Sequence, residues 1–267
     1  VRELSLFSGA GGGLLGTKLL GWQHVGYVEY NDYCQRVIRQ RILDGILENA
    51  PIFGDIRAFI DEGYAESYTG MVDVVTAGFP CQPFSVAGKQ QGGDDSRNMW
   101  PETISVLRTV RPRFALFENV PGLLAHEYAR RIFADLAESG FDARWRVLSA
   151  AEMGAPHKRD RWFCVAHATG EFGNVGDNYR EYSQSEVPEF RDNGRKIPNT
   201  SGQGLEGQQL QSGEGKAYTG VSGSCWWASE PGMGRVANGL ADRVDRLKAL
   251  GNGQVPAVVR AAWNLLN

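Results

Sequence analysis

The chain has 267 residues, which is enough for one large α/β domain with a small satellite but not for two full-sized domains. Hydrophobic residues make up 42% and charged residues 22%, a composition typical of folded proteins, and no stretch approaches the ~18 continuous apolar residues of a membrane span. With 28 basic and 31 acidic residues the net charge is −3, so any polyanion has to be bound through local basic groups.

The cysteines and the first residues bear on where the protein works. Cys34, Cys81, Cys164 and Cys225 are spread along the chain without a C-x-x-C pair, which argues against a structural zinc site and a disulfide framework. The opening VRELSLFSGAGG has no basic run ahead of an apolar stretch and does not resemble a secretory signal. We therefore expect a cytoplasmic protein without a bound metal.

Short apolar runs alternate with longer amphipathic stretches over the first 166 residues, which predicts an α/β fold with a mostly parallel sheet. Seven strands are expected, at Leu4–Phe7, Val25–Glu29, Pro51–Phe53, Val72–Ala77, Phe114–Glu118, Arg144–Ser149 and Trp162–Ala166. Helices are expected at Asp32–Leu47, Met99–Val110, Glu127–Ser139 and Pro256–Leu266. The last two strands have no helix between them, so they are expected to pair antiparallel at one edge.

The composition changes after residue 166. Residues 167–225 hold 11 glycines among 59 positions and almost no apolar period, which indicates a loop-rich segment. We predict a catalytic and cofactor-binding domain formed by residues 1–166 and 248–267, and a small second domain over residues 167–247.

A glycine-rich turn follows the first predicted strand. Leu4–Phe7 leads into Ser8-Gly9-Ala10-Gly11-Gly12-Gly13, where the backbone can approach a ligand at the carboxyl end of the sheet. Glu29 ends the next strand, where an acid can accept hydrogen bonds from both hydroxyls of a ribose. NAD and S-adenosylmethionine both fit this turn, and the turn alone does not choose between them.

A cysteine and an acid end neighbouring predicted strands at the same edge. Cys81 lies in the proline-stiffened run GFPCQPFS after the fourth strand, a placement that suits a nucleophile better than a core residue. Glu118 lies in ENVPG at the end of the fifth strand. The polar, glycine-rich segment after Cys81 is of the kind that closes over a substrate.

These runs together resemble the DNA (cytosine-5) methyltransferase family. LFSGAGG is similar to its cofactor motif, GFPCQPFS to its nucleophile motif, ENVPG to its glutamate motif and ALGNGQVP to its closing motif, in the family's usual order. The resemblance implies S-adenosylmethionine rather than NAD. It also implies the class I S-adenosylmethionine-dependent methyltransferase fold, Rossmann-like with one reversed strand in a seven-stranded sheet, plus a small target-recognition domain.

The resemblance assigns four catalytic residues. Cys81 would add to carbon 6 of cytosine, so that carbon 5 can accept the methyl group, and Glu118 would hydrogen-bond ring nitrogen 3 and the exocyclic amine. Arg161 would bind oxygen 2 of the base, and Arg159 would help to order Glu118. His157 stands where relatives usually carry Gln, which leaves the contact made by that position open.

The cofactor set also comes from the resemblance. It places side chains beside the adenine, on the ribose and along the methionine part of S-adenosylmethionine. Its members are Phe7, Gly9, Gly11, Glu29, Tyr30, Asp55, Ile56, Pro80, Trp100 and Asn252.

The implied substrate is cytosine in double-stranded DNA, flipped out of the stack. The expected DNA contacts are Gln82, Ser85, Arg235 and Arg243. A target-recognition domain as small as residues 167–247 can contact few bases, which predicts a recognition sequence of about two to four base pairs. The family resemblance implies a monomer, and the lack of a long apolar run predicts that the chain binds no membrane. Three alternatives remain: a tRNA cytosine-5 methyltransferase on the same scaffold, a catalytically inactive DNA-binding relative, and an NAD dehydrogenase.

Overall fold

A seven-stranded sheet organises the computed structural model, which describes residues 1–80, 98–125, 127–169 and 243–267. The sheet order is β3-β2-β1-β4-β5-β7-β6. The strands are β1 (Arg2–Leu6), β2 (Gln23–Val28), β3 (Ile52–Phe53), β4 (Val74–Ala77), β5 (Phe114–Asn119), β6 (Phe141–Leu148) and β7 (Arg161–Ala168). Strands β1 to β5 pair in parallel, whereas β7 runs antiparallel to both β5 and β6. The predicted sheet with one reversed strand is confirmed.

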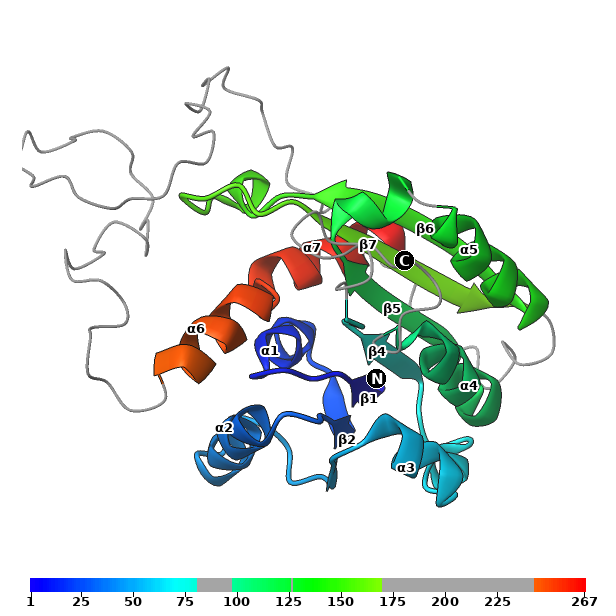
Figure 1. Ribbon diagram of the computed structural model, residues 1–267, viewed down its shortest axis with the longest axis horizontal. Helices are drawn as coiled ribbons and strands as arrows, with labels where there is room; N and C mark the ends of the chain where they lie inside the picture. Colours follow the sequence, from blue (N-terminus) through cyan, green and yellow to red (C-terminus); the bar gives the residue numbers. More distant parts are fainter. Residues whose placement is uncertain (81–97, 126, 170–242) are drawn as a thin grey trace, which may run out of the picture. The chain divides into compact units, whose positions relative to one another are not determined.

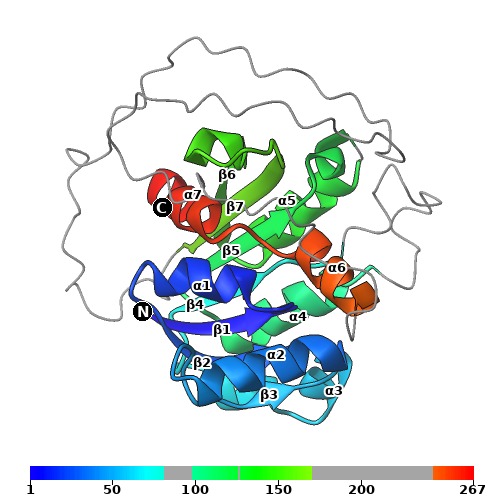
Figure 2. The same cartoon turned by 90° about the vertical axis from the view of Figure 1, so that its left-hand side faces the viewer.

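Helices cover both faces of this sheet. They are α1 (Gly12–Lys18), α2 (Asp32–Leu43), α3 (Ile56–Asp61), α4 (Trp100–Val110), α5 (Tyr128–Glu138), α6 (Arg243–Asn252) and α7 (Pro256–Leu266), with short 3₁₀ turns η1 (Ala65–Tyr68), η3 (Pro121–Ala125) and η4 (Ala151–Met153). Figures 1 and 2 show α1, α2 and α7 on one face and α3, α4 and α5 on the other. This two-sided cover explains why the central strands β1, β4 and β5 are buried along most of their length.

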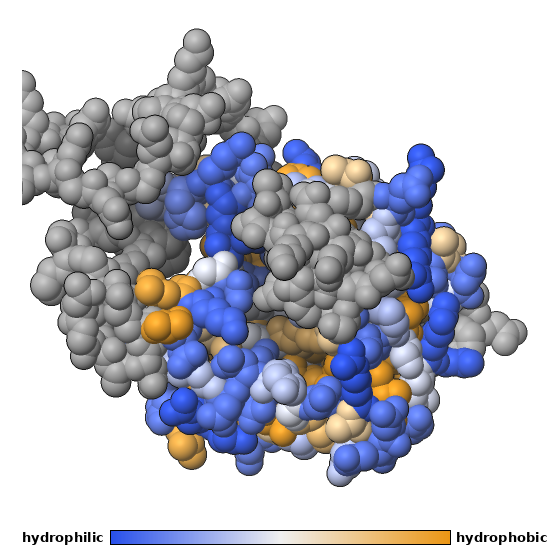
Figure 3. Space-filling model, viewed as in Figure 1, coloured by the Kyte–Doolittle hydropathy of each residue, from blue (hydrophilic) through white to orange (hydrophobic). Residues whose placement is uncertain are grey.

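The alternation of side chains along the strands divides the core into two main layers. Phe117 and Cys164 point toward α4 and α5, whereas Leu116 and Phe163 point toward α7. On the second side Trp263 of α7 packs edge-to-face on Trp22, with ring centroids 4.6 Å apart. In the view of Figure 3 the described surface is mostly hydrophilic, with apolar residues in small groups.

Helix ends follow local signals. The side chains of Asn31 and Asp55 accept backbone N–H bonds at the starts of α2 and α3. Helix α2 ends at Leu43 rather than at the predicted Leu47, because Gly45 adopts a left-handed backbone (φ +69°) that turns the chain out of the helix. Helix α7 has the predicted bounds Pro256–Leu266.

A buried polar cluster ties β1 and β2 to the segment before β3. The imidazole of His24 lies between two carboxylates: Nε2 is 3.3 Å from Glu3, and Nδ1 contacts Glu48. The hydroxyl of Thr76 donates to Glu3 at 2.6 Å, and Lys18 pairs with Glu48 at 2.9 Å. Burial by itself would lower the pKa of His24, but the hydrogen bonds and charges of the two glutamates outweigh it and raise that pKa.

Most of the predicted second domain, residues 167–247, lies outside the described residues, so its boundaries stay a prediction. Strand β7 continues to Ala168, and helix α6 begins at Arg243. Within the described ranges no helix is both long and apolar enough to cross a bilayer.

Candidate active site

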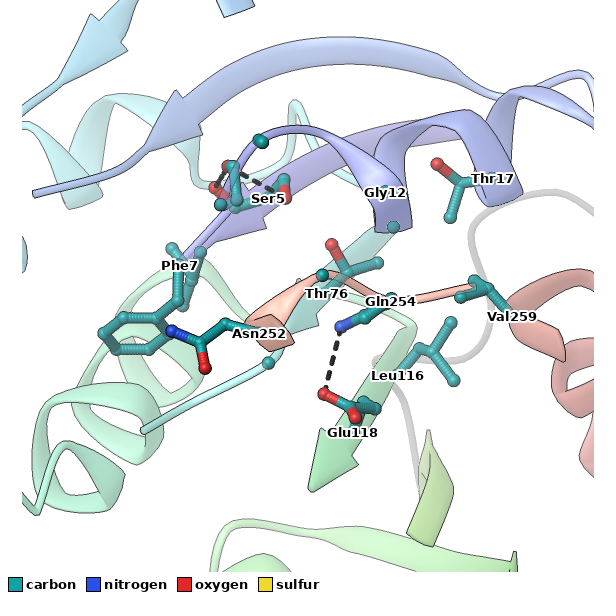
Figure 4. Close-up of a pocket in the computed structure, with 17 residues that line it drawn as sticks. Ser5, Phe7, Gly12, Thr17, Thr76, Leu116, Glu118, Asn252, Gln254 and Val259 are labelled. Atoms are coloured by element: carbon teal, nitrogen blue, oxygen red, sulfur yellow. Dashed lines mark hydrogen bonds between the residues drawn. The ribbon is translucent and has the colours of Figure 1, made fainter. Parts of the chain in front are cut away.

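A small cavity lies at the carboxyl ends of β1, β4 and β5, beneath the connection from α6 to α7 (Figure 4). Its volume is about 40 Å³, room for one or a few water molecules. It is lined by Ser5, Leu6, Phe7, Ser8, Gly9, Ala10, Gly12, Gly13, Thr17, Thr76, Gly78, Leu116, Glu118, Asn252, Gly253, Gln254 and Val259. Parallel strands bring their carboxyl ends to one edge, which is where ligands bind in sheets of this type.

Glu118 is the titratable group on the wall of this cavity. Its side chain is buried, and its two oxygens have separate partners: Oε1 is 3.0 Å from Nε of Arg161, and Oε2 accepts a 3.4 Å hydrogen bond from the amide of Gln254. Burial raises the pKa of Glu118 to about 7, against the opposing influence of Arg161, Arg159 and Gln254. Near neutral pH this carboxyl can therefore either give or accept a proton.

The reversed strand explains how Arg161 reaches Glu118. Because β7 is antiparallel to β5, its first residue lies at the edge where β5 ends. Glu118 is paired with Phe163, and Arg161 is two residues before Phe163, so Arg161 and Glu118 project from the same face of the sheet. The structure thus brings together two of the residues predicted to be catalytic.

Arg159 has different partners. Its guanidinium donates to the carbonyl oxygen of Gly251 at 2.9 Å and also to that of Gly253, and its own backbone is left-handed (φ +42°). Burial lowers the pKa of Arg159, as does the charge of Arg161, while Glu118 raises it. The side chain fastens the turn between α6 and α7 to the loop before β7.

The glycine turn after β1 is held by a buried acid. The N–H of Gly9 donates to Oε2 of Glu29 at 2.6 Å, and the N–H of Asn31 donates to Oε1 at 2.7 Å. Burial raises the pKa of Glu29, although both N–H bonds and the charge of Lys248 lower it. Gly9 (φ +56°) and Gly11 (φ +88°) adopt the left-handed backbone that this turn requires.

The other described members of the predicted cofactor set, apart from Trp100, differ in their surroundings. Phe7 lines the cavity with a left-handed backbone (φ +53°), and Asn252 lines it from the end of α6. Tyr30, directly after Glu29, is 80% exposed. Asp55 caps α3 through the N–H of Arg57, the next residue Ile56 is buried in the core, and Pro80 is half-buried.

The structure does not bring Trp100 to the cavity. Its side chain is fully buried between Phe79 and Phe117, and its indole N–H donates to Asp135 at 2.7 Å. Its assignment to the cofactor set stays a prediction. The ring is a core element that attaches α4 to α5.

Four predicted residues fall outside the described part of the chain: Cys81, Gln82, Ser85 and Arg235. Arg243 begins α6, but its side chain is likewise outside the description. Their roles stay predictions.

Gln254 is a site residue that the sequence reasoning missed. It lies in the run ALGNGQVP, from which only Asn252 was assigned to the site. The signal that could have found it is the same run, since a polar side chain two positions after Asn252 in so short a turn has few directions in which to project. Among the described residues, no group of three or more His, Cys, Asp or Glu side chains is placed to hold a metal ion.

The sheet order, the reversed β7 and the loops at the carboxyl edge define an α/β protein of the class I methyltransferase fold. The chain belongs to the C-5 cytosine-specific DNA methylase family, whose family model matches residues 1–216.

Curated relatives agree with this family. The chain is 36% identical over 168 residues to the Type II methyltransferase M.NgoMIV of Neisseria gonorrhoeae, covering 61% of this chain and 51% of the relative. It is 34% identical to the Type II methyltransferase M.AplI of Arthrospira platensis, covering 62% of this chain and 45% of the relative. The chain thus spans about half the length of the curated relatives it matches.

Solved structures share the fold. The S. pombe Dnmt2 methyltransferase superposes with a TM-score of 0.50 at 23% identity, covering 68% of this chain and 58% of that one. The Entamoeba histolytica methyltransferase EhMeth gives 0.51 at 16% identity, covering 64% and 53%. At these identities the likeness concerns the fold alone.

Proposed function

We propose that this chain transfers a methyl group from S-adenosylmethionine to carbon 5 of cytosine in double-stranded DNA, through a covalent bond to Cys81. The observation that carries the proposal is the ion pair between buried Glu118 and half-buried Arg161 at the carboxyl edge of the sheet, with a pKa of about 7 for Glu118. Cys81 follows Pro80 directly on the segment that leaves β4, the strand beside β5. Family membership and the named Type II methyltransferase relatives support the same reaction.

The residues of the β1 turn fit an adenosyl ligand. The buried carboxylate of Glu29 has lone pairs beyond its two N–H partners with which to accept ribose hydroxyls, and Tyr30 offers an exposed aromatic face. A cavity of about 40 Å³ is too small for a nucleoside, so the adenosyl part would lie outside it, along Glu29, Tyr30 and Asp55. S-adenosylmethionine would supply the electrophilic methyl group there.

The chain's own residues account for the activation of the base. The thiolate of Cys81 bonds to carbon 6, and the displaced π electrons make carbon 5 nucleophilic while ring nitrogen 3 gains negative charge. Glu118 in its acid form donates a proton or hydrogen bond to nitrogen 3, and Arg161 holds the carboxyl in place and faces the developing charge. Methyl transfer to carbon 5 would break the bond between the methyl group and the cofactor sulfur and leave S-adenosylhomocysteine. A base such as water would then take the proton from carbon 5, and the electron pair that returns to the ring would expel Cys81 as thiolate.

Trapping with 5-fluorocytosine tests the nucleophile. Duplex DNA carrying this base, incubated with S-adenosylmethionine, is expected to give a denaturation-resistant adduct, because fluorine cannot leave as the proton does. Peptide mapping should place the adduct on Cys81, and Cys81→Ser should abolish it. An adduct that survives Cys81→Ser would refute the assignment.

Two further measurements decide the substrate. Methyl transfer to duplex DNA is expected to exceed transfer to tRNA, and the reverse result would favour the tRNA alternative. Bisulfite sequencing of DNA from cells that express the chain should show methylation in a context of about two to four specified base pairs. A recognition sequence of six or more specified base pairs would contradict the prediction that the small domain of residues 167–247 contacts only a few bases.

A further inference from the structure

Gln254 occupies a central place at the cavity although no family motif assigned it a role. It lies in the connection between α6 and α7, and its amide points at Glu118 (Figure 4). The amide nitrogen is 3.4 Å from Oε2 of Glu118, while Arg161 is bound to Oε1. Both oxygens of the Glu118 carboxyl group therefore have a partner: Oε1 contacts the cation of Arg161, and Oε2 accepts a hydrogen bond from the neutral amide of Gln254.

Glycines make the room for this amide. A Cβ atom added at Gly13 would come within 2.7 Å of Oε1 of Gln254, and one added at Gly78 within 2.6 Å of its Nε2. A Cβ at Gly12 would collide with the backbone oxygen of Gln254. Neither Gly13 nor Gly78 has the positive φ that would require glycine for backbone reasons, so close approach explains both.

The turn that carries Gln254 is also fixed from the other side. Arg159 donates to the carbonyls of Gly251 and Gly253, and Val259 of α7 packs against Gly16 of α1. The half-buried guanidinium of Arg159 thus holds the turn that carries Gln254, and the side chain of Gln254 lies against glycines on α1 and after β4.

We propose that Gln254 is a positioning residue for the reaction, which holds the carboxyl of Glu118 in the orientation that faces the target base. The inference rests on the function proposed above. An amide suits this task because its nitrogen can donate to a carboxylate and its oxygen can accept from the protonated acid, so it can bond Glu118 in both protonation states. An arginine can only donate, so it cannot accept the proton-side hydrogen bond of the acid form and favours the charged form.

The groups that face Glu118 from its neighbours set the expected pH response. Among the described residues these are Arg161 on β7, Arg159 before β7, and Gln254. Gln254 and both arginines favour the carboxylate and burial favours the acid. Removal of the Gln254 donor should therefore raise the pKa of Glu118.

The test begins with Gln254→Leu, which removes the amide and keeps most of the volume. We expect kcat for methyl transfer to duplex DNA to fall about tenfold, the scale of a lost hydrogen bond to a charged group, with little change in KM for DNA. The limb of the pH profile that belongs to Glu118 should move to higher pH. Gln40→Leu is the matched control, since Gln40 also donates to a carboxylate, Asp44, but on the exposed side of α2; its rate should equal that of the unmodified chain.

A second readout does not depend on activity. Infrared titration of the carboxyl band in the protein without ligands, with Glu118→Gln to identify the band, should show a higher midpoint in Gln254→Leu. If the unmodified chain transfers no methyl group but this midpoint moves, the proposed function fails and the contact stands. If methyl transfer occurs and neither the midpoint, kcat nor the pH limb changes, the positioning role is overturned.

If Gln254→Leu does not fold, Gly13→Ala provides a second test of the contact between Gln254 and Glu118. Alanine suits a helix better than glycine, and the added Cβ meets the side chain of Gln254 within 4 Å. Gly13→Ala should lower kcat and move the midpoint in the unmodified chain, but should do neither in a Gln254→Ala background. Equal effects in both backgrounds would contradict the proposal.

Discussion

At the scale of the residue, burial raises the pKa of the Glu118 carboxyl group to about 7, so that part of it is protonated near neutral pH. Glu118 is withdrawn from water on a strand end, and burial acts on its pKa more strongly than the two arginines and the amide that oppose it. An isolated surface glutamate would be ionised at pH 7 and unable to donate a proton. The location of this side chain, rather than its chemical type, gives it the capacity for acid catalysis.

Glu118→Gln should separate activity from stability. The pKa of Glu118 in the folded chain, about 7, exceeds its ordinary value of 4.5, so folding stability is expected to decline as the pH rises from 4.5 to 7, by about 3 kcal/mol at most. Glutamine imitates the neutral acid and should remove that decline while it lowers kcat roughly 10²–10⁴-fold. Urea unfolding at pH 5 and pH 8 measures the first effect; an unchanged pH dependence would contradict it.

His24 should also make the folding stability decline as the pH rises, but at higher pH than Glu118 does. Its raised pKa means that its contribution is complete below its ordinary pKa of 6.5 and is lost as the pH rises through the folded value. His24→Leu leaves Glu3 buried without its cation, which should cost roughly 3–5 kcal/mol at pH 6. Urea unfolding between pH 6 and 9 is the measurement; a loss that is the same at every pH would show that His24 is neutral.

At the scale of the element, the packing of α1 against α7 positions the connection that carries Gln254. Gly16 of α1 lies against Val259 and the carbonyl of Pro256, where a Cβ would come within 2.6 Å of the Cβ of Val259 and within 2.8 Å of that oxygen. Neither contact can be relieved by moving the tip of a flexible side chain. The packing of α1 against α7 therefore fixes the position of the turn that carries Gln254.

Gly16→Ala should destabilise the chain by about 1–3 kcal/mol through overpacking, despite the better helix propensity of alanine. Gly251→Ala is the matched control, because a Cβ at Gly251 in α6 meets no atom of the described residues within 4 Å. Thermal unfolding of both variants measures the difference. Equal melting temperatures would mean that α1 and α7 can separate without cost.

Sequence periodicity predicted the elements well because each strand and helix carries its own pattern. The seven strands and helix α7 were recognisable from apolar spacing, and the antiparallel β6–β7 pair from the missing helix between them. Strand and helix ends shifted by a few residues, as at α2, because backbone bonds near Gly45 rather than hydrophobic spacing set the end.

The candidate site was predictable only where a residue lies in a recognisable run. Glu118 and Arg161 were found in this way, and the structure places them in contact. Gln254 and the cluster around His24 were missed because their partners are distant in the sequence and meet only in the folded chain. Trp100 was assigned by resemblance alone; the structure shows its ring buried in the core, and its contact with a cofactor stays a prediction.

At the scale of the whole molecule, the four thiols should differ sharply in reactivity. Burial raises the pKa of Cys34 to about 11 and that of Cys164 to about 12, so both are protonated at pH 7.5. Cys81 and Cys225 lie outside the described residues. Native alkylation followed by mass spectrometry should modify Cys81 while Cys34 and Cys164 stay unmodified until the chain is unfolded; prompt labelling of Cys164 would show that the sheet opens.

The pairing of β7 with β5 restricts how this protein can change. Side chains on neighbouring strands share a face only at even offsets, and Glu118 opposite Phe163 sets that parity. A shift of β7 by a single position would turn Arg161 to the face that packs on α5, whereas the loop that precedes β7 can gain or lose residues without altering the parity. Insertions or deletions in the loop ahead of Arg159 therefore leave the facing of Arg161 unchanged, whereas along β7 only a shift by two positions does so.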